Sequence, residues 1–312
     1  SPTVAKAVID APMSHAIADG LANALVGEDP LAIEACMDRM WEKANYYGRT
    51  GVGTHAMAGI NLALWDIAGK ALGVPVWRLL GGKHRDRVRL YANLNRGTLD
   101  RSSNGFGDAA RRAVAAGFTA VKSTPFDEVD AALPSSAKIA AAEAGLERLW
   151  AAREAIGPEV DLLVDCHQRF DLDSAMEIAS QLEPLDLFWF EEPVPDTDVE
   201  ALAKISRKSK QRIAGGEMLC GEEHFARYVD SEAVHILMPD IKYAGGLTPC
   251  LEVARRSASS GIPVSPHNPS GPVSTAASAH LAAAIGNFLT LEYAFGEVEW
   301  REQLVSPKEK VV

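Results

Sequence analysis

Acidic side chains follow three successive apolar runs in the second half of the sequence. They are Asp165, Glu191 and Glu217. Three carboxylates brought together would repel one another strongly unless a cation lay between them. Hard oxygen ligands, with no cysteine or group of histidines beside them, favour Mg²⁺ over Zn²⁺, and Mn²⁺ is an alternative ion for such a site. We therefore predict that these residues bind a divalent metal ion. The alternative, that the carboxylates are structural residues, would require a separate ion-pair partner for each of them.

Other apolar runs in the sequence also end in residues that can carry charge. These residues are Lys122, Asp240, His267 and Glu292. A second histidine, His167, follows Asp165 by two positions, so both side chains would point to the same side of an extended strand. Cys166, between them, would point to the opposite side, which favours packing in the core over catalysis. One charged strand end is unremarkable, but a series of them indicates a shared active site.

The apolar runs that precede these residues alternate with helical stretches. The eight candidate strands are Val88–Tyr91, Thr119–Lys122, Asp161–Val164, Asp186–Phe190, Gln211–Ala214, His235–Met238, Ile262–Val264 and Leu289–Leu291. Alanine-rich helices are predicted between several of them, at Ala109–Ala116, Ala137–Ala155 and Leu247–Ser257. This alternation favours a closed (β/α)8 barrel over an open sheet, whose glycine fingerprint is missing after the first strand. The active sites of such barrels lie at the carboxyl ends of the strands, where the charged residues would meet.

The first part of the sequence is predicted to be mostly helical. Gly27–Pro30 is typical of a turn before a helix, and Ile33, Met37 and Met40 follow at helical spacing. A second helix at Thr54–Leu72 is predicted to stop at the glycine and proline that follow it. We predict an α/β protein with a helical capping domain at residues 1–86 and a barrel domain at residues 87–312.

The composition excludes several classes of protein. Of the 312 residues, 47% are hydrophobic and 23% charged, which is ordinary for a globular protein. No apolar run is long enough for a membrane span, and no basic segment before an apolar one marks a secretory signal. The net charge of −11 argues against a nucleic-acid-binding surface. The four cysteines form no CxxC pair, so we predict free thiols in a cytoplasmic protein without nucleic-acid or membrane partners.

Several motifs resemble the enolase superfamily, in particular its mandelate racemase and muconate lactonising subgroup. They are ALWDIAGK at 63–70, PVWRLLGG at 75–82, EEP at 191–193 and the Gly216-Glu217 pair. The resemblance covers nearly the whole chain and implies a modified (β/α)7β barrel with an α+β capping domain, whose N-terminal strands we expect to be absent here. It also implies that Asp165, Glu191 and Glu217 bind Mg²⁺. Glu192 matches a supporting position beside them, and we group it with the substrate-binding candidates.

The chemistry implied by this resemblance is removal of the proton α to a carboxylate. Asp240 and His267 are implied as the base dyad. Carbon acids of this kind are very weak, so the enediolate needs a metal ion and cationic donors. A histidine titrates near neutral pH, and an aspartate beside it would fix its tautomer and raise its basicity. Lys122 would support the substrate carboxylate, and Glu292 would form a hydrogen bond with one of its oxygens.

Two positions distinguish among members of the subgroup. Racemases have Lys-x-Lys at the end of the second strand, but here only the first lysine, Lys122, is present. The position of the second is Thr124, whose hydroxyl cannot act as a base near neutral pH. The Asp-x-His-x-Arg run at 165–169 and the loop Pro266–Pro272 look instead like those of acid-sugar dehydratases that act on galactonate or mannonate. In those enzymes the histidine protonates the departing β-hydroxyl. The alternative for His167 is a hydrogen-bond donor beside the metal.

We predict a Mg²⁺-dependent acid-sugar dehydratase that forms a 2-keto-3-deoxy acid. The further substrate-binding candidates are Asn93, Asn95, Thr124 and Arg169; the asparagines and the arginine could equally belong to ordinary loop structure. One alternative is an epimerase or cycloisomerase that uses His267 alone, and another is a catalytically weak homologue that senses a ligand. The resemblance further implies a homo-oligomer, from dimer to octamer.

Overall fold

The computed structural model describes residues 12–45 and 50–311. The helices are α2 (Pro12–Asn23), α3 (Ile33–Ala44), α4 (Val52–Leu72), α5 (Val76–Leu79), α6 (Ser103–Ala115), α7 (Ser135–Ala141), α8 (Glu143–Ile156), α9 (Leu172–Leu182), α10 (Val199–Lys208), α11 (Glu222–Asp230), α12 (Leu247–Ser259) and α13 (Pro272–Ala284), with the short 3-10 helices η1 (Glu183–Leu185) and η2 (Arg301–Gln303). The strands are β1 (Leu90–Asn93), β2 (Ala120–Ser123), β3 (Asp161–Asp165), β4 (Trp189–Glu191), β5 (Ile213–Gly215), β6 (Ile236–Leu237) and β7 (Leu291–Ala294). None of the described helices is long and apolar enough to cross a membrane.

The chain divides into two compact units. Unit 1 comprises the residues up to Arg89, Glu217–Ala226 and Met238–Leu291. Unit 2 comprises Leu90–Gly216, Arg227–Leu237 and the residues from Glu292 onward.

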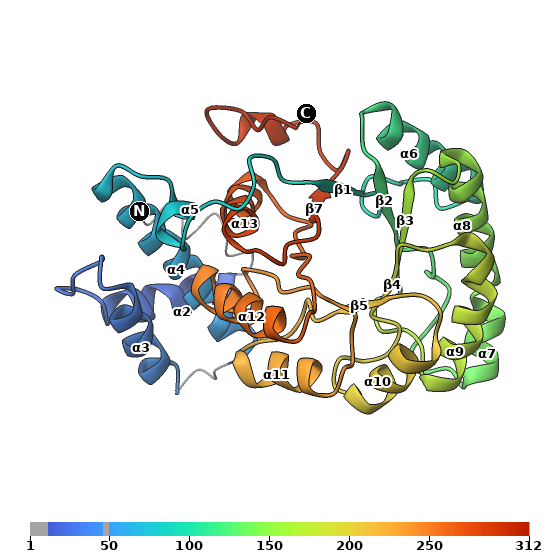
Figure 1. The fold of residues 1–312 in the computed structure, drawn as a ribbon, viewed down its shortest axis with the longest axis horizontal. Coiled ribbons are helices and arrows are strands. Elements are labelled where there is room, and N and C mark those ends of the chain that lie inside the picture. The colour runs from blue at the N-terminus through green and yellow to red at the C-terminus, as the bar shows by residue number, and fades with distance from the viewer. Residues whose placement is uncertain (1–11, 46–49, 312) are drawn as a thin grey trace. The chain divides into compact units, whose positions relative to one another are not determined.

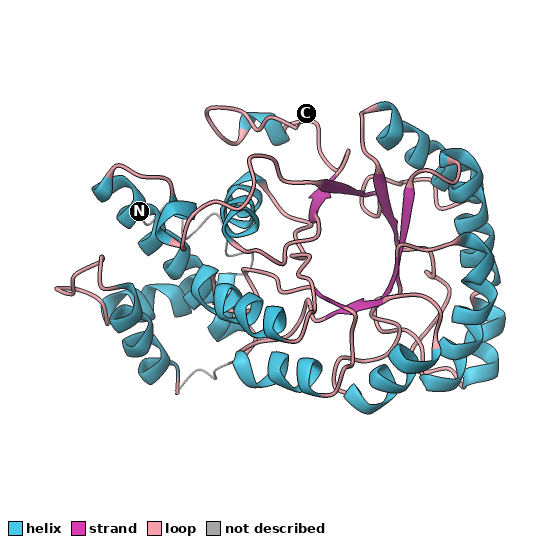
Figure 2. Ribbon diagram, viewed as in Figure 1, coloured by secondary structure: helices cyan, strands magenta, loops and turns pink. Residues whose placement is uncertain are grey.

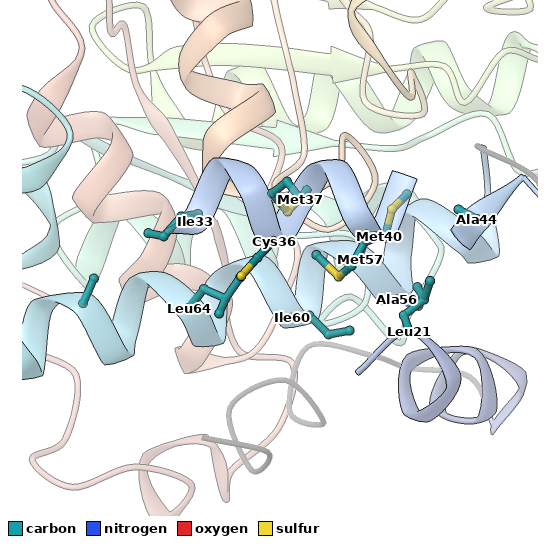
Figure 3. Close-up of a cluster of buried hydrophobic side chains, with 11 residues drawn as sticks. Leu21, Ile33, Cys36, Met37, Met40, Ala44, Ala56, Met57, Ile60 and Leu64 are labelled. Atoms are coloured by element: carbon teal, nitrogen blue, oxygen red, sulfur yellow. The ribbon is translucent and has the colours of Figure 1, made fainter. Parts of the chain in front are cut away.

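A cluster of buried apolar side chains joins α2, α3 and α4 in unit 1 (Figure 3). Ile33, Cys36, Met37 and Met40 contribute to it from one face of α3, as their helical spacing predicts. The end of α4 also follows the prediction, because Gly73 adopts a left-handed conformation with φ of 65° and its N–H bonds back to the carbonyl of the last turn. Local sequence signals therefore account for the helices of this part.

Helix α4 also contacts α12, which comes much later in the chain but lies in the same unit. The hydroxyl of Thr248 on α12 accepts hydrogen bonds from Asn61 Nδ2 at 2.9 Å and from Trp65 Nε1 at 3.0 Å. Both donors lie on α4, four positions apart, and so share one face of the helix. Unit 1 therefore combines helices from the predicted capping domain with helices from the predicted barrel domain, and the predicted boundary at residue 86 stays a prediction.

Among the described residues, seven strands form one curled sheet with the order β6-β5-β4-β3-β2-β1-β7 (Figure 2). The pairs from β1 through β6 are parallel. Helices α6, α8, α9 and α10 lie along the outside of the curled sheet (Figure 1). The strands are short and almost wholly buried, as expected for a parallel sheet covered by helices. The predicted barrel-type α/β fold with a capping domain is confirmed.

The predicted strands needed correction in several places. Ile262–Val264 forms no strand of the sheet and makes only a bridge from Val264 to Phe288. The prolines at 263 and 266 flank that position and have no N–H to donate to a ladder, which explains the short pairing. The first, fifth and last predicted strands begin two residues later than predicted, at Leu90, Ile213 and Leu291, and the fourth begins three residues later, at Trp189. The helix predicted at 137–155 is two helices, α7 and α8, which meet at Ala142.

Candidate active site

Five polar side chains lie at or near the carboxyl ends of strands in unit 2. They are Asn93 on β1, Lys122 on β2, Asp165 on β3, Glu191 on β4 and Glu292 on β7. The sheet register places Asn93 opposite Lys122 and Asp165 opposite Glu191. Because parallel strands present their carboxyl ends at one edge, residues far apart in the sequence come together there.

The ammonium group of Lys122 lies among three carboxylates. Its Nζ is 2.6 Å from Glu191 Oε1, 3.0 Å from Glu292 Oε1 and 3.3 Å from Asp165 Oδ2. Burial alone would lower the pKa of Lys122, but the carboxylates, Glu191 foremost, raise it well above its ordinary value. Burial and the charge of Asp165 raise the pKa of Glu191. One ammonium among three carboxylates leaves an excess of negative charge that suits a further cation.

His167 lies beside Asp165, but strand alternation does not place it there. Strand β3 ends at Asp165, and His167 and Gln168 have positive φ angles of 47° and 60°. The His167 N–H donates to Asp165 Oδ1 at 3.0 Å, and His167 Nε2 lies 3.2 Å from Asp165 Oδ2. A tight turn therefore brings the imidazole back to the carboxylate. Asp165 raises the pKa of His167, and 40% of the histidine side chain is exposed, so a ligand can reach it.

Glu192 holds the loop that follows β5. Its Oε1 accepts a hydrogen bond from the Gly216 N–H at 2.9 Å, and its Oε2 accepts one from Gln168 Nε2. Burial raises the pKa of the Glu192 carboxyl. Because Gly216 directly precedes Glu217, these hydrogen bonds fix the backbone at the start of the segment that carries the third predicted metal ligand.

The residues of the predicted base dyad lie together in unit 1. His267 Nδ1 and Asp240 Oδ2 share a hydrogen bond of 2.8 Å. The Lys242 N–H donates to Asp240 Oδ1 at 2.6 Å, and Lys242 Nζ lies 3.5 Å from Asp240 Oδ2. Burial alone would raise the pKa of Asp240, but Lys242 and His267 lower it. An ionised Asp240 beside Nδ1 leaves Nε2, which lies 3.1 Å from Glu217 Oε2, as the nitrogen that can take a proton.

The donor set fits a divalent cation. Asp165 and Glu191 are paired on neighbouring strands of unit 2, and Glu217, which follows β5 in the chain, offers a third carboxylate. Oxygen donors of this kind suit Mg²⁺ or Mn²⁺ better than a softer ion. An acidic triad suitable for a metal is therefore present, and the identity of the ion stays a prediction.

The remaining predicted substrate contacts have varied surroundings. Asn93 Nδ2 donates to Glu292 Oε1 at 2.6 Å, and Asn93 Oδ1 accepts the N–H of Asn95 at 2.8 Å. Arg169 Nη1 donates to the carbonyl of Val129 at 2.7 Å, so this part of its guanidinium supports a loop. Thr124 Oγ1 is buried and has no hydrogen-bond partner among the described residues. A substrate role stays a prediction for each of these candidates.

The sequence reasoning missed Lys242 and Trp189. Lys242 contacts Asp240 through both its backbone and its side chain. Trp189 Nε1–H donates to Glu191 Oε2 at 2.7 Å. Trp189 lies two positions before Glu191 in a predicted strand, so the shared face was a signal that could have drawn attention to it.

Comparisons with known proteins identify the family of this chain. Residues 4–81 match the family model described as mandelate racemase / muconate lactonizing enzyme, N-terminal domain, and residues 105–312 match the model described as enolase C-terminal domain-like. The chain is 33% identical over 285 residues to a D-gluconate dehydratase from Thermoproteus tenax, covering 91% of this chain and 56% of that protein. It is 34% identical over 272 residues to a D-galactonate dehydratase from Verminephrobacter eiseniae, covering 87% of this chain and 69% of that protein.

A solved structure shows the same fold. The mandelate racemase/muconate lactonizing enzyme-like protein from Rubrobacter xylanophilus superposes with a TM-score of 0.87 at 36% identity, covering 94% of this chain and 79% of that one. The resemblance found in the sequence is thereby confirmed: the chain belongs to the mandelate racemase / muconate lactonizing enzyme family of the enolase superfamily and is similar to its acid-sugar dehydratases.

Proposed function

We propose that this chain is a hydro-lyase that dehydrates a sugar acid to a 2-keto-3-deoxy acid. The observation that supports this choice within the family is the position of His167, whose Nε2 lies 3.2 Å from Asp165 Oδ2 with the side chain partly exposed. A second proton-transfer group beside a carboxylate of the metal triad is what a β-elimination needs. Relatives at about one-third identity are named as dehydratases of gluconate and galactonate, although the chain spans little more than half of the first of them.

The proposed metal ion is Mg²⁺, with Mn²⁺ as an alternative. Asp165, Glu191 and Glu217 would hold it. When bound, such an ion stabilises the negative charge that develops on a substrate carboxylate as the neighbouring carbon loses its proton. Lys122, which already lies among carboxylates, would add a fixed positive charge at the same place.

His267 is proposed as the general base. Its Nε2 accepts the proton on the carbon next to the substrate carboxylate, and the electron pair of that C–H bond moves into an enediolate. Asp240 holds Nδ1 at 2.8 Å, so the ring keeps its tautomer and the imidazolium is stabilised as it forms. The Lys242 contacts keep Asp240 ionised and in place.

His167 is proposed as the general acid. Collapse of the enediolate expels the hydroxyl from the β-carbon, and His167 donates its proton to that oxygen, so that the leaving group is water. The enol that remains takes up a proton and becomes the 2-keto-3-deoxy acid. The higher pKa that Asp165 gives His167 keeps this proton available near neutral pH. Glu292 and the predicted substrate contacts Asn93, Asn95, Thr124, Arg169 and Glu192 would orient the acid.

A screen of aldonic and aldaric acids in the presence of Mg²⁺ tests the proposal. A product that reacts with semicarbazide is expected, because only dehydration gives a 2-keto acid. Exchange of the α-proton with solvent deuterium but no keto product would indicate an epimerase or cycloisomerase instead. Tight sugar-acid binding with neither exchange nor product would indicate a ligand-sensing homologue. A homo-oligomeric state and a cytoplasmic location, both expected from the sequence, belong to the same proposal.

A further inference from the structure

The indole ring of Trp189, on strand β4 of unit 2, lies next to a proposed metal ligand. The side chain is fully buried. Its Nε1–H donates to Glu191 Oε2 at 2.7 Å, from two positions earlier on the same strand. An indole N–H can only donate, so Trp189 is the donor and Glu191 Oε2 the acceptor in this bond.

The second oxygen of the same carboxylate is held from another strand. Glu191 Oε1 accepts a hydrogen bond from Lys122 Nζ at 2.6 Å. The two donors come from β4 and β2, and each engages a different oxygen. The plane of the Glu191 carboxylate is therefore set by the chain itself, through one charged donor and one neutral donor.

The indole is in turn held by its own neighbours. The ring of Tyr91 meets it edge to face, with centroids 5.3 Å apart and planes at 88°. The ammonium group of Lys122 lies 5.6 Å from the centroid of the same tyrosine ring. Tyr91 is fully buried, and its hydroxyl has no hydrogen-bond partner among the described residues. Tyr91 therefore contacts both donors to Glu191, Trp189 and Lys122, through its ring.

We propose that Trp189 is a positioning residue that orients Glu191 for a divalent cation and thereby sets the affinity of the site. The proposal rests on the metal site of the proposed function. A hydrogen bond from a neighbouring side chain to a metal-ligating carboxylate restricts the ligand to the orientation that the ion requires, and its loss costs about 10- to 100-fold in metal affinity. A ring that merely filled the core would contribute to stability but not to this affinity.

Binding of Mn²⁺ to the full chain, measured by calorimetry and by electron paramagnetic resonance, tests the proposal. Trp189→Phe keeps an aromatic ring but removes the N–H, and we expect its Mn²⁺ affinity to fall about 10- to 100-fold. Tyr91→Phe is the matched control, because it keeps the supporting ring and removes a hydroxyl without a partner among the described residues. Its Mn²⁺ affinity should stay within about twofold of that of the wild type.

The outcomes separate this inference from the function on which it rests. If the wild type binds Mn²⁺ and Trp189→Phe binds it equally well, the positioning role is wrong while the metal site stands. If Tyr91→Phe weakens binding as much as Trp189→Phe, general disturbance of the core explains the effect and the hydrogen bond does not. If the wild type itself binds no Mn²⁺, the metal site of the proposed function is wrong.

A second measurement uses the wild type alone and does not depend on whether a variant folds. The chain has six tryptophans, so ¹⁵N-indole labelling of the wild type gives six N–H signals. The signal of Trp189 is identified by its proximity to the Tyr91 ring protons. Addition of Mg²⁺ should shift this signal more than the other five, because the ion withdraws charge from the accepting carboxylate. A Trp189 signal that moves no more than the others would overturn the proposal.

Discussion

Two groups of charged side chains in unit 2 differ in how completely the chain balances them. Arg148 forms a two-pronged ion pair with Glu128, at 2.6 and 2.7 Å, and Arg101 forms a similar pair with Asp127, at 2.7 and 2.8 Å. Here two cations meet two anions. Around Lys122, by contrast, one buried cation meets three buried carboxylates.

From this difference we expect the arginine pairs to stabilise the protein and the cluster around Lys122 to bind a metal ion. A balanced pair satisfies its own charges and needs nothing further. Buried carboxylates that outnumber their cation are costly unless another positive charge joins them. We call the Arg148–Glu128 and Arg101–Asp127 pairs the outer pairs, and Lys122 with its three carboxylates the inner cluster. We therefore expect changes in the outer pairs to alter stability alone, and changes in the inner cluster to alter metal binding and turnover. Metal removal, variants of both clusters and a change of pH can test that contrast.

Removal of divalent ions should have the largest effect. Dialysis against a chelator is expected to lower sugar-acid turnover by about 10⁴-fold or more, because the ion supplies several kcal/mol of stabilisation to the developing charge. Activity should return with added Mg²⁺ or Mn²⁺. Full turnover in chelator would contradict the proposed metal site. It would also contradict the proposal that the carboxylates of the inner cluster bind a further cation.

The two histidines should separate the two proton transfers. His267→Asn is expected to lower both α-proton exchange and dehydration by about 10²- to 10⁴-fold, because the general base is lost. His167→Asn should lower dehydration by a similar factor but leave exchange largely intact. Exchange is followed in deuterated water by mass spectrometry, and dehydration by the semicarbazide test. Normal dehydration by His167→Asn would show that another group is the acid.

Lys122→Met should destabilise the metal-free protein strongly. Removal of one partner of a buried ion pair costs about 3–5 kcal/mol, because the remaining charges are left uncompensated. Urea unfolding in chelator and in Mg²⁺ measures the effect. Mg²⁺ should recover part of the lost stability, since a cation then lies among the carboxylates again.

Arg148→Met is the matched change in the outer pairs. It removes hydrogen bonds to Glu128 and to the carbonyls of Arg101 and Pro125, and should cost about 2–3 kcal/mol. Mg²⁺ should not recover this loss, and turnover should be unchanged. A similar recovery by Mg²⁺ in both variants would remove the contrast between the clusters.

The smallest effect concerns the pH dependence of the outer pair. The hydrogen bonds from Arg148 hold the pKa of Glu128 below its ordinary value. A carboxyl whose pKa is lower in the folded state stabilises that state above its unfolded pKa of about 4.3, and this contribution is lost as the pH falls through the lower folded value. Unfolding by urea at pH 6 and at pH 3 should therefore show a smaller loss of stability for Arg148→Met than for the wild type. Equal losses would show that this pair does not contribute.

Much of the fold could be predicted from local sequence patterns, and the errors of that prediction also have local causes. The end of α4 was predicted because a glycine and a proline stop a helix through their own backbone properties. The strand expected at Ile262–Val264 was overestimated because apolar character was weighed above the two prolines that interrupt its ladder. The turn at His167 was missed because alternation was extended beyond the last residue of β3.

The chemical groups of the candidate site, and the apolar run that each one follows, can be read from the amino-acid sequence. Apolar periodicity and the residue that interrupts it are local properties, so Asp165, Glu191 and Lys122 could be named without coordinates. Only the tertiary structure decided which atoms those groups contact. Lys122 and Glu191 are 69 positions apart, yet their side chains meet at 2.6 Å. Contacts of that kind depend on the register of neighbouring strands and on packing beneath them, as with Trp189 and Tyr91, and no short stretch of sequence encodes either.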